Sequence, residues 1–73
     1  MVEKAEEYLK EGGLKDVRVR CQGLTARIEI PQDELKHFFS KYNFNELVQY
    51  FSCLGFNCTS LDLEGLISGK LNR

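Results

Sequence analysis

The sequence predicts a single small α+β domain with elements in the order α-β-β-α-α-β. Its small three-stranded sheet includes a β-hairpin and has helices packed on one face. Two alternating segments flank Gln22-Gly23, and segments with apolar residues at helical spacing lie before and after them. The chain has 73 residues, of which 42% are hydrophobic, which suits one core and no more. We therefore expect residues 1–73 to form one domain.

The first predicted helix runs from Val2 to Glu11. Its apolar residues recur at helical spacing, at Val2, Ala5, Tyr8 and Leu9. The pair Gly12-Gly13 follows, where the C-terminus of a helix is expected. Glu6 falls on another side of this helix, and exposure to solvent is the default expectation for it.

The hairpin is predicted from alternation on both sides of a turn signal. Residues 17–21 and 24–30 alternate apolar with polar side chains, and Gln22-Gly23 between them is typical of a two-residue turn. With Gln22-Gly23 as the loop, Val19 is predicted to lie directly across from Ala26. The apolar residues of both strands then share one face, which we expect the helices to cover.

The same alternation gathers charged side chains on the opposite face, namely Arg18, Arg20, Arg27 and Glu29. The predicted register places Arg18 directly across from Arg27, and like charges in that position repel. A bound phosphate or carboxylate would relieve this repulsion, because guanidinium groups bind such anions in a bidentate manner. In the alternative interpretation the face is solvated, and Glu29 and Asp16 neutralise the arginines. Spacing alone favours the solvated face.

Two more helices and a third strand complete the predicted fold. Pro31 ends the second strand, and apolar residues at helical spacing predict a helix over 32–42. Asn43 resembles the N-cap of another helix, which Gly55 ends. Alternation predicts a strand over 57–63, whereas residues 66–73 show no assignable period.

Composition disfavours two classes of partner. The net charge is −1, and no aromatic residue is interleaved with the arginines for base stacking, so nucleic-acid binding is not expected. No apolar run approaches the roughly 20 residues that span a bilayer, so we expect no membrane segment. Three cysteines and no signal-like start favour a reducing compartment, which predicts a cytoplasmic location.

Cysteine and histidine are assigned structural roles. Cys21, Cys53 and Cys58 lack CxxC spacing and lie beside apolar residues, so we place them in the core or at its edge and predict no metal site. His37 is the single histidine, and the neighbouring sequence supplies no partner for catalysis.

The segment after residue 60 offers two weaker signals. Asp62 either caps the following turn or accepts hydrogen bonds from an arginine, and spacing leaves both roles open. The tail is not a phosphate-binding loop of this kind, because Glu64 and Leu71 stand where that loop requires glycine and a hydroxyl residue.

Three blocks of sequence form a recognisable combination when taken in order. They are Ala5-Glu6-Glu7-Tyr8-Leu9, then Val17-Arg18-Val19-Arg20 with Ala26-Arg27-Ile28-Glu29, and finally Leu61-Asp62-Leu63-Glu64-Gly65 with Ser68-Gly69 and Asn72. The combination resembles the C-terminal region of LarE-type ATP-dependent sacrificial sulfur transferases, which belong to the PP-loop ATP pyrophosphatase superfamily. The resemblance covers nearly the whole chain.

This resemblance implies a role within a larger enzyme. In the family, an N-terminal PP-loop domain binds ATP with Mg and adenylylates a carboxylate of a pyridinium mononucleotide, after which a cysteine gives up its sulfur. This chain has neither the ATP-binding loop nor the family's upstream cysteine. The resemblance thus implies a C-terminal accessory domain with no catalytic residue or cofactor of its own. Its implied partners are the N-terminal domain, the mononucleotide substrate and further copies in a homo-oligomer.

Residue roles follow from the matched positions. Arg18 and Arg20 match paired arginines that face the substrate phosphate in the family. Glu6 and Glu29 match its acidic residues near the sulfur-donor site. The resemblance leaves Arg27 without an assigned role, so it stays a further candidate, together with Asp62.

The sequence departs from the family pattern at two places. Cys21-Gln22 stands where the family usually has a His-rich turn, and Leu66-Ile67 stands where it prefers Tyr-Arg. These departures leave the exact substrate open, and we expect partner contacts at Leu66-Ile67. Two alternatives need no parent enzyme: a self-standing anion- or nucleotide-binding regulatory module that uses the arginine face, and an oligomerisation unit.

Overall fold

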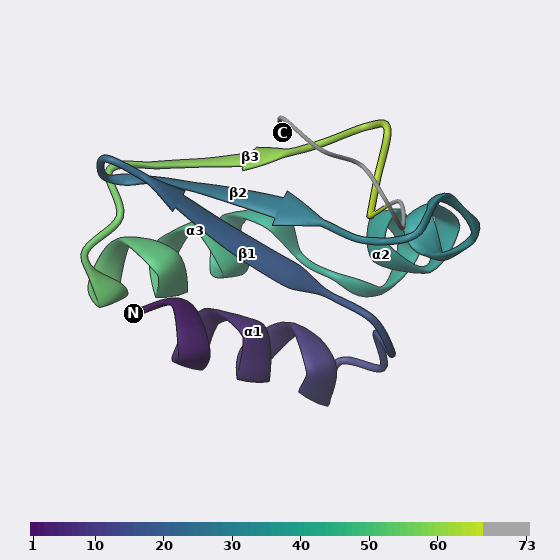
Figure 1. Ribbon diagram of the computed structural model, residues 1–73. Helices are drawn as coiled ribbons and strands as arrows, with labels where there is room; N and C mark the ends of the chain where they lie inside the picture. The colour runs from purple at the N-terminus through teal and green to yellow at the C-terminus, as the bar shows by residue number, and fades with distance from the viewer. Residues whose placement is uncertain (67–73) are drawn as a thin grey trace.

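A three-stranded sheet with helices on one face forms the fold, seen here in a computed structural model that describes residues 1–66 (Figure 1). Its elements are α1 (Val2–Glu11), β1 (Arg18–Gln22), β2 (Thr25–Glu29), the 3-10 helix η1 (Gln32–Glu34), α2 (Leu35–Lys41), α3 (Phe44–Leu54) and β3 (Cys58–Leu61). Figure 1 shows α1 and α3 beneath the same face of the sheet, with α2 at the end opposite the hairpin turn. The predicted fold class and element order are confirmed.

The core lies between this face of the sheet and the helices. Its buried hydrophobic residues are Ala5, Leu9, Leu14, Val17, Val19, Ala26, Ile28, Ile30, Phe38, Leu47, Phe51 and Phe56. Phe51 is fully buried, and its ring contacts those of Tyr8 and Phe56 at centroid distances of 6.3 and 5.8 Å. The predicted apolar face of the hairpin therefore does point into the core.

The register of the hairpin differs from the predicted one by two residues. Val19 lies across from Ile28, and Arg20 rather than Arg18 lies across from Arg27. The predicted register was therefore wrong, and with it the predicted repulsion between Arg18 and Arg27. A shift of two residues keeps every side chain on its face, because side chains alternate with a period of two.

The hairpin turn explains this shift. Gln22 pairs with Thr25, so Gly23 and Leu24 form the two-residue loop. Gly23 has a φ of 61°, the left-handed conformation that the mirror-image hairpin turns require at their first central position. The glycine therefore occupies the first place in the loop rather than the second.

The third strand, β3, runs parallel to β2 and makes β2 the central strand. Ser60 lies beside Arg27, and Leu61 beside Ile28. Beyond β3 the chain continues along the same side, since the amide of Leu66 donates to the carbonyl of Ile30 at 2.9 Å. The tail motif at Ser68-Gly69 and Asn72 and the contact expected of Ile67 lie outside the described residues.

The second and third predicted helices are also found. The segment predicted as one helix over 32–42 forms η1 followed by α2. The side chain of Asn43 accepts the amide of Glu46 at 3.1 Å and caps α3, which Gly55 ends with a φ of 115°. Within residues 1–66, no helix combines the length and apolar character needed to cross a membrane.

Candidate functional site

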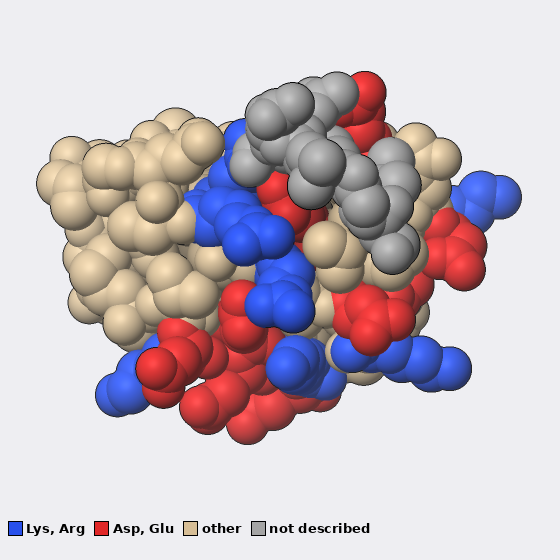
Figure 2. Space-filling view, viewed as in Figure 1, with Lys and Arg blue, Asp and Glu red and all other residues tan. Residues whose placement is uncertain are grey.

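The outer face of the sheet, which points away from α1 and α3, carries the charged side chains of the hairpin. Arg18 lies across from Glu29, and Arg20 across from Arg27. Figure 2 shows basic side chains gathered over the middle of the sheet on the viewed side. The four charged residues thus share one face, as the alternation predicted.

Glu29 lies at the centre of this cluster and is almost fully buried, with 3% of its surface exposed. Its Oε1 accepts from Nε of Arg20 at 3.2 Å, and its Oε2 lies 3.0 Å from Nη2 of Arg27. Removing a carboxylate from water is costly, and two guanidinium groups offset that cost here. The arginine that lies directly across, Arg18, forms no ion pair within residues 1–66.

The three arginines differ in how accessible they are. The side chain of Arg27 is 21% exposed and that of Arg20 is 51% exposed, while Arg18 is an exposed residue. Nε of Arg27 is buried and has no hydrogen-bond partner among the described residues. Arg18 and the terminal nitrogens of Arg20 are therefore the groups best placed to receive an anion from solvent.

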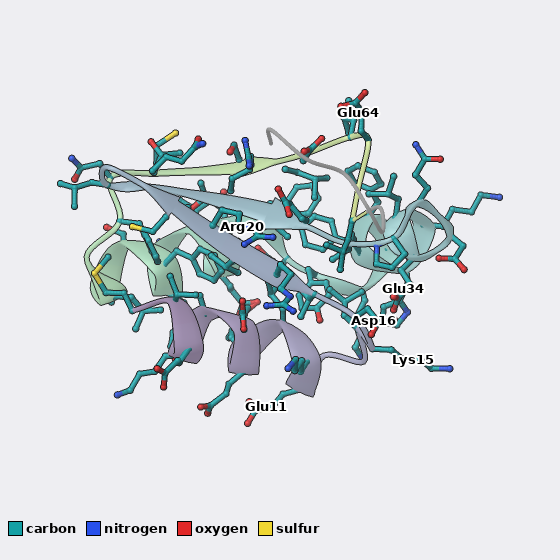
Figure 3. The ribbon with its side chains drawn as sticks, viewed as in Figure 1. Glu11, Lys15, Asp16, Arg20, Glu34 and Glu64 are labelled. Carbon is teal, nitrogen blue, oxygen red and sulfur yellow. The ribbon has the colours of Figure 1, made fainter. Side chains whose placement is uncertain are left out.

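Carboxylates accompany the arginines of this face in unequal positions. Glu29 lies between the guanidinium groups, while Glu6 and Asp62 lie at the margins of the face. Asp16, which the solvated interpretation used as a second counter-ion, forms no ion pair in the described part of the chain. Its amide, together with that of Lys15, donates to the carboxylate of Glu34, at 3.5 and 2.9 Å respectively. Figure 3 shows these three residues together near α2.

Glu6 does not join the arginine cluster but lies beside it. Its Oε2 accepts the backbone amide of Val19 at 2.9 Å, along the free edge of β1. Val19 stands between Arg18 and Arg20 in the strand, so the carboxylate of Glu6 fixes the backbone that carries both arginines. The default expectation of a solvated side chain missed this contact, because only the packing of α1 against β1 creates it.

Asp62 caps a turn, which is one of the two roles that spacing left open. Its Oδ1 accepts the amide of Glu64 at 3.0 Å, and its carbonyl accepts the amide of Gly65 at 3.0 Å. The amide of Asp62 donates to the carbonyl of Ile28 at 2.9 Å. Continuing the register of β2 and β3 by one residue places Asp62 beside Glu29, at the margin of the outer face.

The predicted core position of the cysteines was wrong. Cys21, Cys53 and Cys58 are free thiols, and all three are exposed. Cys21 and Cys53 lie next to the ends of β1 and α3, and Cys58 begins β3 beside Thr25, on the face of the sheet that points away from the helices. Nε2 of His37 lies 3.0 Å from the carbonyl of Gly12, which ties α2 to the end of α1. Among residues 1–66, no group of three or more His, Cys, Asp or Glu side chains is arranged to hold a metal ion.

Three tyrosines, Tyr8, Tyr42 and Tyr50, pack in the helix layer. The rings of Tyr8 and Tyr50 stack at a centroid distance of 4.7 Å, and the hydroxyl of Tyr42 donates to the carbonyl of Leu9. Burial raises the pKa of Tyr8, and the nearby Glu46 and Tyr50 raise it further. Burial is also the main cause that raises the pKa of Tyr42. All three tyrosines are partly buried against the core.

A groove between α2, α3 and β3 was not predicted from the sequence. It has a volume of about 230 Å³, and none of the described residues that line it is charged. Phe39, Phe44 and Val48 are about half exposed there. The sequence contained one signal of an exposed apolar surface here. Phe38 and Phe39 are adjacent in one helix, so their side chains point in different directions and only one of them reaches the core.

Together the fold and the cluster define a small α+β domain whose outer sheet face carries arginines around a buried glutamate. No model of a known protein family matches the chain. It is 47% identical over 72 residues to an uncharacterized protein of Synechocystis sp.. It is also 41% identical over 69 residues to the pyridinium-3,5-bisthiocarboxylic acid mononucleotide synthase of Lactiplantibacillus plantarum.

These two similarities extend along most of this chain but along little of each relative. They cover 99% and 93% of the chain, yet only 27% and 24% of the respective relatives. The chain thus spans about a quarter of the length of the curated relatives that it matches. The partial match fits a fragment of a LarE-type protein, as the resemblance of its motifs implied.

Proposed function

We propose that this chain is the C-terminal domain of a PP-loop ATP-dependent sulfur transferase-like protein, in which it contributes phosphate-binding arginines and acidic residues to the substrate site. The observation that carries the proposal is its similarity, over nearly the whole chain, to the Lactiplantibacillus plantarum synthase. The name of that synthase specifies a pyridinium mononucleotide, and a mononucleotide carries a phosphate. A basic sheet face in the matched domain is consistent with that ligand chemistry.

Arg18 and Arg20 are the proposed phosphate ligands. Both are exposed, and they stand two residues apart on β1, so their side chains leave the strand on the same face. Guanidinium groups stay charged at neutral pH and match the geometry of phosphate oxygens. Arg27 is largely engaged by Glu29, so we give it a supporting role rather than a direct one.

Glu6 and Glu29 are the proposed acidic residues of the site. Each already accepts a hydrogen bond from β1 or its side chains, Glu6 from the Val19 amide and Glu29 from Arg20. They flank the arginines from the edge and from the outer face of the strand. In the assembled protein we expect them to shape the wall between the phosphate and the sulfur-donor site. Asp62, which lies at the margin of the outer face, is a further candidate.

The reaction itself belongs to a parent protein that is longer than this chain. We propose that an N-terminal PP-loop domain of the same protein holds ATP and Mg, since this chain has no Ser-Gly-Gly-x-Asp-Ser loop. Bound there, ATP supplies the activation of a substrate carboxylate. We further propose a pyridinium mononucleotide-type substrate, a homo-oligomeric full-length protein and a cytoplasmic location. The present chain alone then has no enzymatic activity.

A self-standing anion- or nucleotide-binding regulatory module is the alternative. One observation favours it: residues 1–66 bury a hydrophobic core of their own, and the arginine face needs no second domain to be formed. The two candidates differ in what precedes Met1 in the gene. A reading frame that continues upstream into a PP-loop domain supports the accessory domain. A frame that starts at Met1, with no neighbouring gene for a PP-loop domain, supports the module.

Amide NMR on the 73-residue chain tests the site that both candidates share. Inorganic phosphate and a pyridine mononucleotide are titrated separately to millimolar concentration. We expect shifts of the Arg18 to Arg20 amides on β1 and of their neighbours on β2, and a tighter response to the mononucleotide. Absence of shifts on both strands at millimolar ligand would count against the phosphate site.

A further inference from the structure

Among the charged residues of the described chain, only Glu29 is buried. Its neighbours on the same face are far more accessible, and the side chain of Arg20 is 51% exposed. An unpaired carboxylate in this position would strongly favour exposure, so the pairing with arginine is what retains it. The outer face is therefore organised around a fixed negative charge and is not a set of independent arginines.

The two carboxylate oxygens of Glu29 contact different arginines. Oε1 receives Nε of Arg20, and Oε2 lies against a terminal nitrogen of Arg27. A contact through Nε fixes the guanidinium plane of Arg20 but occupies neither of its terminal nitrogens. Within residues 1–66, those two nitrogens hold no hydrogen bond. Arg20 is thus oriented and still able to bind an anion, as Figure 3 shows it lying over the sheet.

We infer that Glu29 is a positioning residue: it holds the guanidinium of Arg20 in the orientation that receives the phosphate, while Arg27 is the counter-ion that keeps the carboxylate in place. This inference rests on the phosphate site proposed above and deepens it. Arg18, which Glu29 does not hold, completes the site as a more mobile second ligand. Fixing one arginine in advance lowers the entropy that binding must remove.

Charge and position act in opposite directions on anion binding, which makes the inference testable. A carboxylate beside the arginines weakens their attraction for phosphate, because like charges repel. If charge were its sole contribution, replacing Glu29 by a neutral residue of the same shape would tighten phosphate binding. If position dominates, the same replacement weakens it.

The first measurement uses the unaltered chain and requires no variant. The arginine Nε–H signals are recorded by NMR, and exchange with water is compared for Arg20 and Arg18. We expect slow exchange at Arg20, whose Nε donates to a buried carboxylate, and fast exchange at Arg18. Equally fast exchange at both arginines would overturn the inference.

The second measurement compares Glu29→Gln with Glu11→Gln by titration with inorganic phosphate. Glu11 is an exposed residue at the end of α1 that Figure 3 shows apart from Arg20, so its variant removes the same charge elsewhere. We expect phosphate binding about tenfold weaker in Glu29→Gln, as for the loss of one charge-assisted hydrogen bond, and unchanged in Glu11→Gln. Amide spectra of both variants verify the fold.

Each outcome separates this inference from the proposed function. If the unaltered chain binds phosphate and Glu29→Gln binds it equally or more tightly, the positioning role fails while the phosphate site stands. If the unaltered chain does not bind phosphate, the proposed site and the inference built on it both fail. If Glu29→Gln does not fold, the exchange measurement on the unaltered chain still decides between a held and a free Arg20.

Discussion

The inner and outer faces of the hairpin are built from alternate residues of the same two strands, yet different interactions stabilise their buried side chains. On the inner face the side chains of Val19 and Ile28 are apolar and are buried by packing against the helices. On the outer face Glu29 is buried to a similar degree, but two guanidinium groups hold it there. Equal burial therefore has a different physical cause on each face.

This difference separates stability from binding. Apolar contacts are summed over the whole core, so a change on the inner side lowers the free energy of unfolding. Exposed charges add little to stability, so we expect a change at an exposed outer residue to act on the proposed anion binding instead. The following experiments test this separation of stability from binding, from the largest expected effect to the smallest.

Replacing Phe51 by Ala should have the largest effect. Phe51 is fully buried between the sheet and the helices, and truncation of such a side chain costs about 3–5 kcal/mol. A domain of this size has little more stability than that to lose, so we expect it to be largely unfolded at room temperature. Circular dichroism during urea denaturation measures the change. Phe39→Ala, at a half-exposed phenylalanine, serves as control and should unfold near the unaltered midpoint.

Replacing Arg18 by Gln should leave stability unchanged and weaken anion binding. Arg18 is exposed and forms no ion pair within residues 1–66. Loss of one guanidinium contact is expected to weaken phosphate binding by about tenfold. Lys4→Gln removes the same charge from α1 and should bind phosphate as the unaltered chain does. Phosphate titration followed by amide NMR measures the affinity of each variant, and thermal unfolding measures its stability. Together they decide whether Arg18 acts on binding and not on stability.

Replacing Glu6 by Ala tests the link between the two faces. The carboxylate accepts the buried Val19 amide at 2.9 Å, and the loss of that acceptor should cost about 1–2 kcal/mol in unfolding free energy. Glu6→Gln retains an acceptor oxygen and should cost less. The measurement is urea denaturation of both variants. A Glu6→Ala variant as stable as Glu6→Gln would contradict the role of this hydrogen bond.

Alkaline pH should reveal the smallest effect. Because the pKa of Tyr8 is raised in the fold, its neutral form is favoured there, and its contribution is complete below pH about 10. The contribution is lost as the pH rises through the folded pKa. We expect the unfolding free energy to fall above pH about 10, and less steeply in Tyr8→Phe. The pKa of Tyr42 is also raised, so the Tyr8→Phe variant keeps part of the dependence of stability on pH. Identical slopes in the two proteins would exclude Tyr8 as a cause.

Local signals in the sequence predicted the elements that local interactions stabilise. The first helix has the predicted bounds, Val2–Glu11, because its spacing and the glycine pair act within a few residues. Asn43 and Gly55 likewise cap α3 as expected. The hairpin register was beyond such signals, since two registers that differ by two residues give the same buried and exposed sets.

The candidate site was predictable only in part. Alternation alone placed the arginines and Glu29 on one face, and the family resemblance selected Arg18, Arg20, Glu6 and Glu29. Neither source indicated that Glu29 is buried or which arginines it pairs with. The contact of Glu6 with the Val19 amide also had no sequence signal, because the two residues belong to different elements that meet only after folding.

The sequence by itself determined the order of the elements and which residues of the hairpin face the core, because periodicity and turn chemistry act over a few residues. Tertiary structure decided the rest. Backbone geometry at Gly23 chose the register, parallel addition of β3 made β2 the central strand, and α1 brought Glu6 to the edge of β1. These outcomes depend on contacts between residues far apart in the chain, and it is burial in that setting that turns Glu29 from a surface charge into the centre of the arginine cluster.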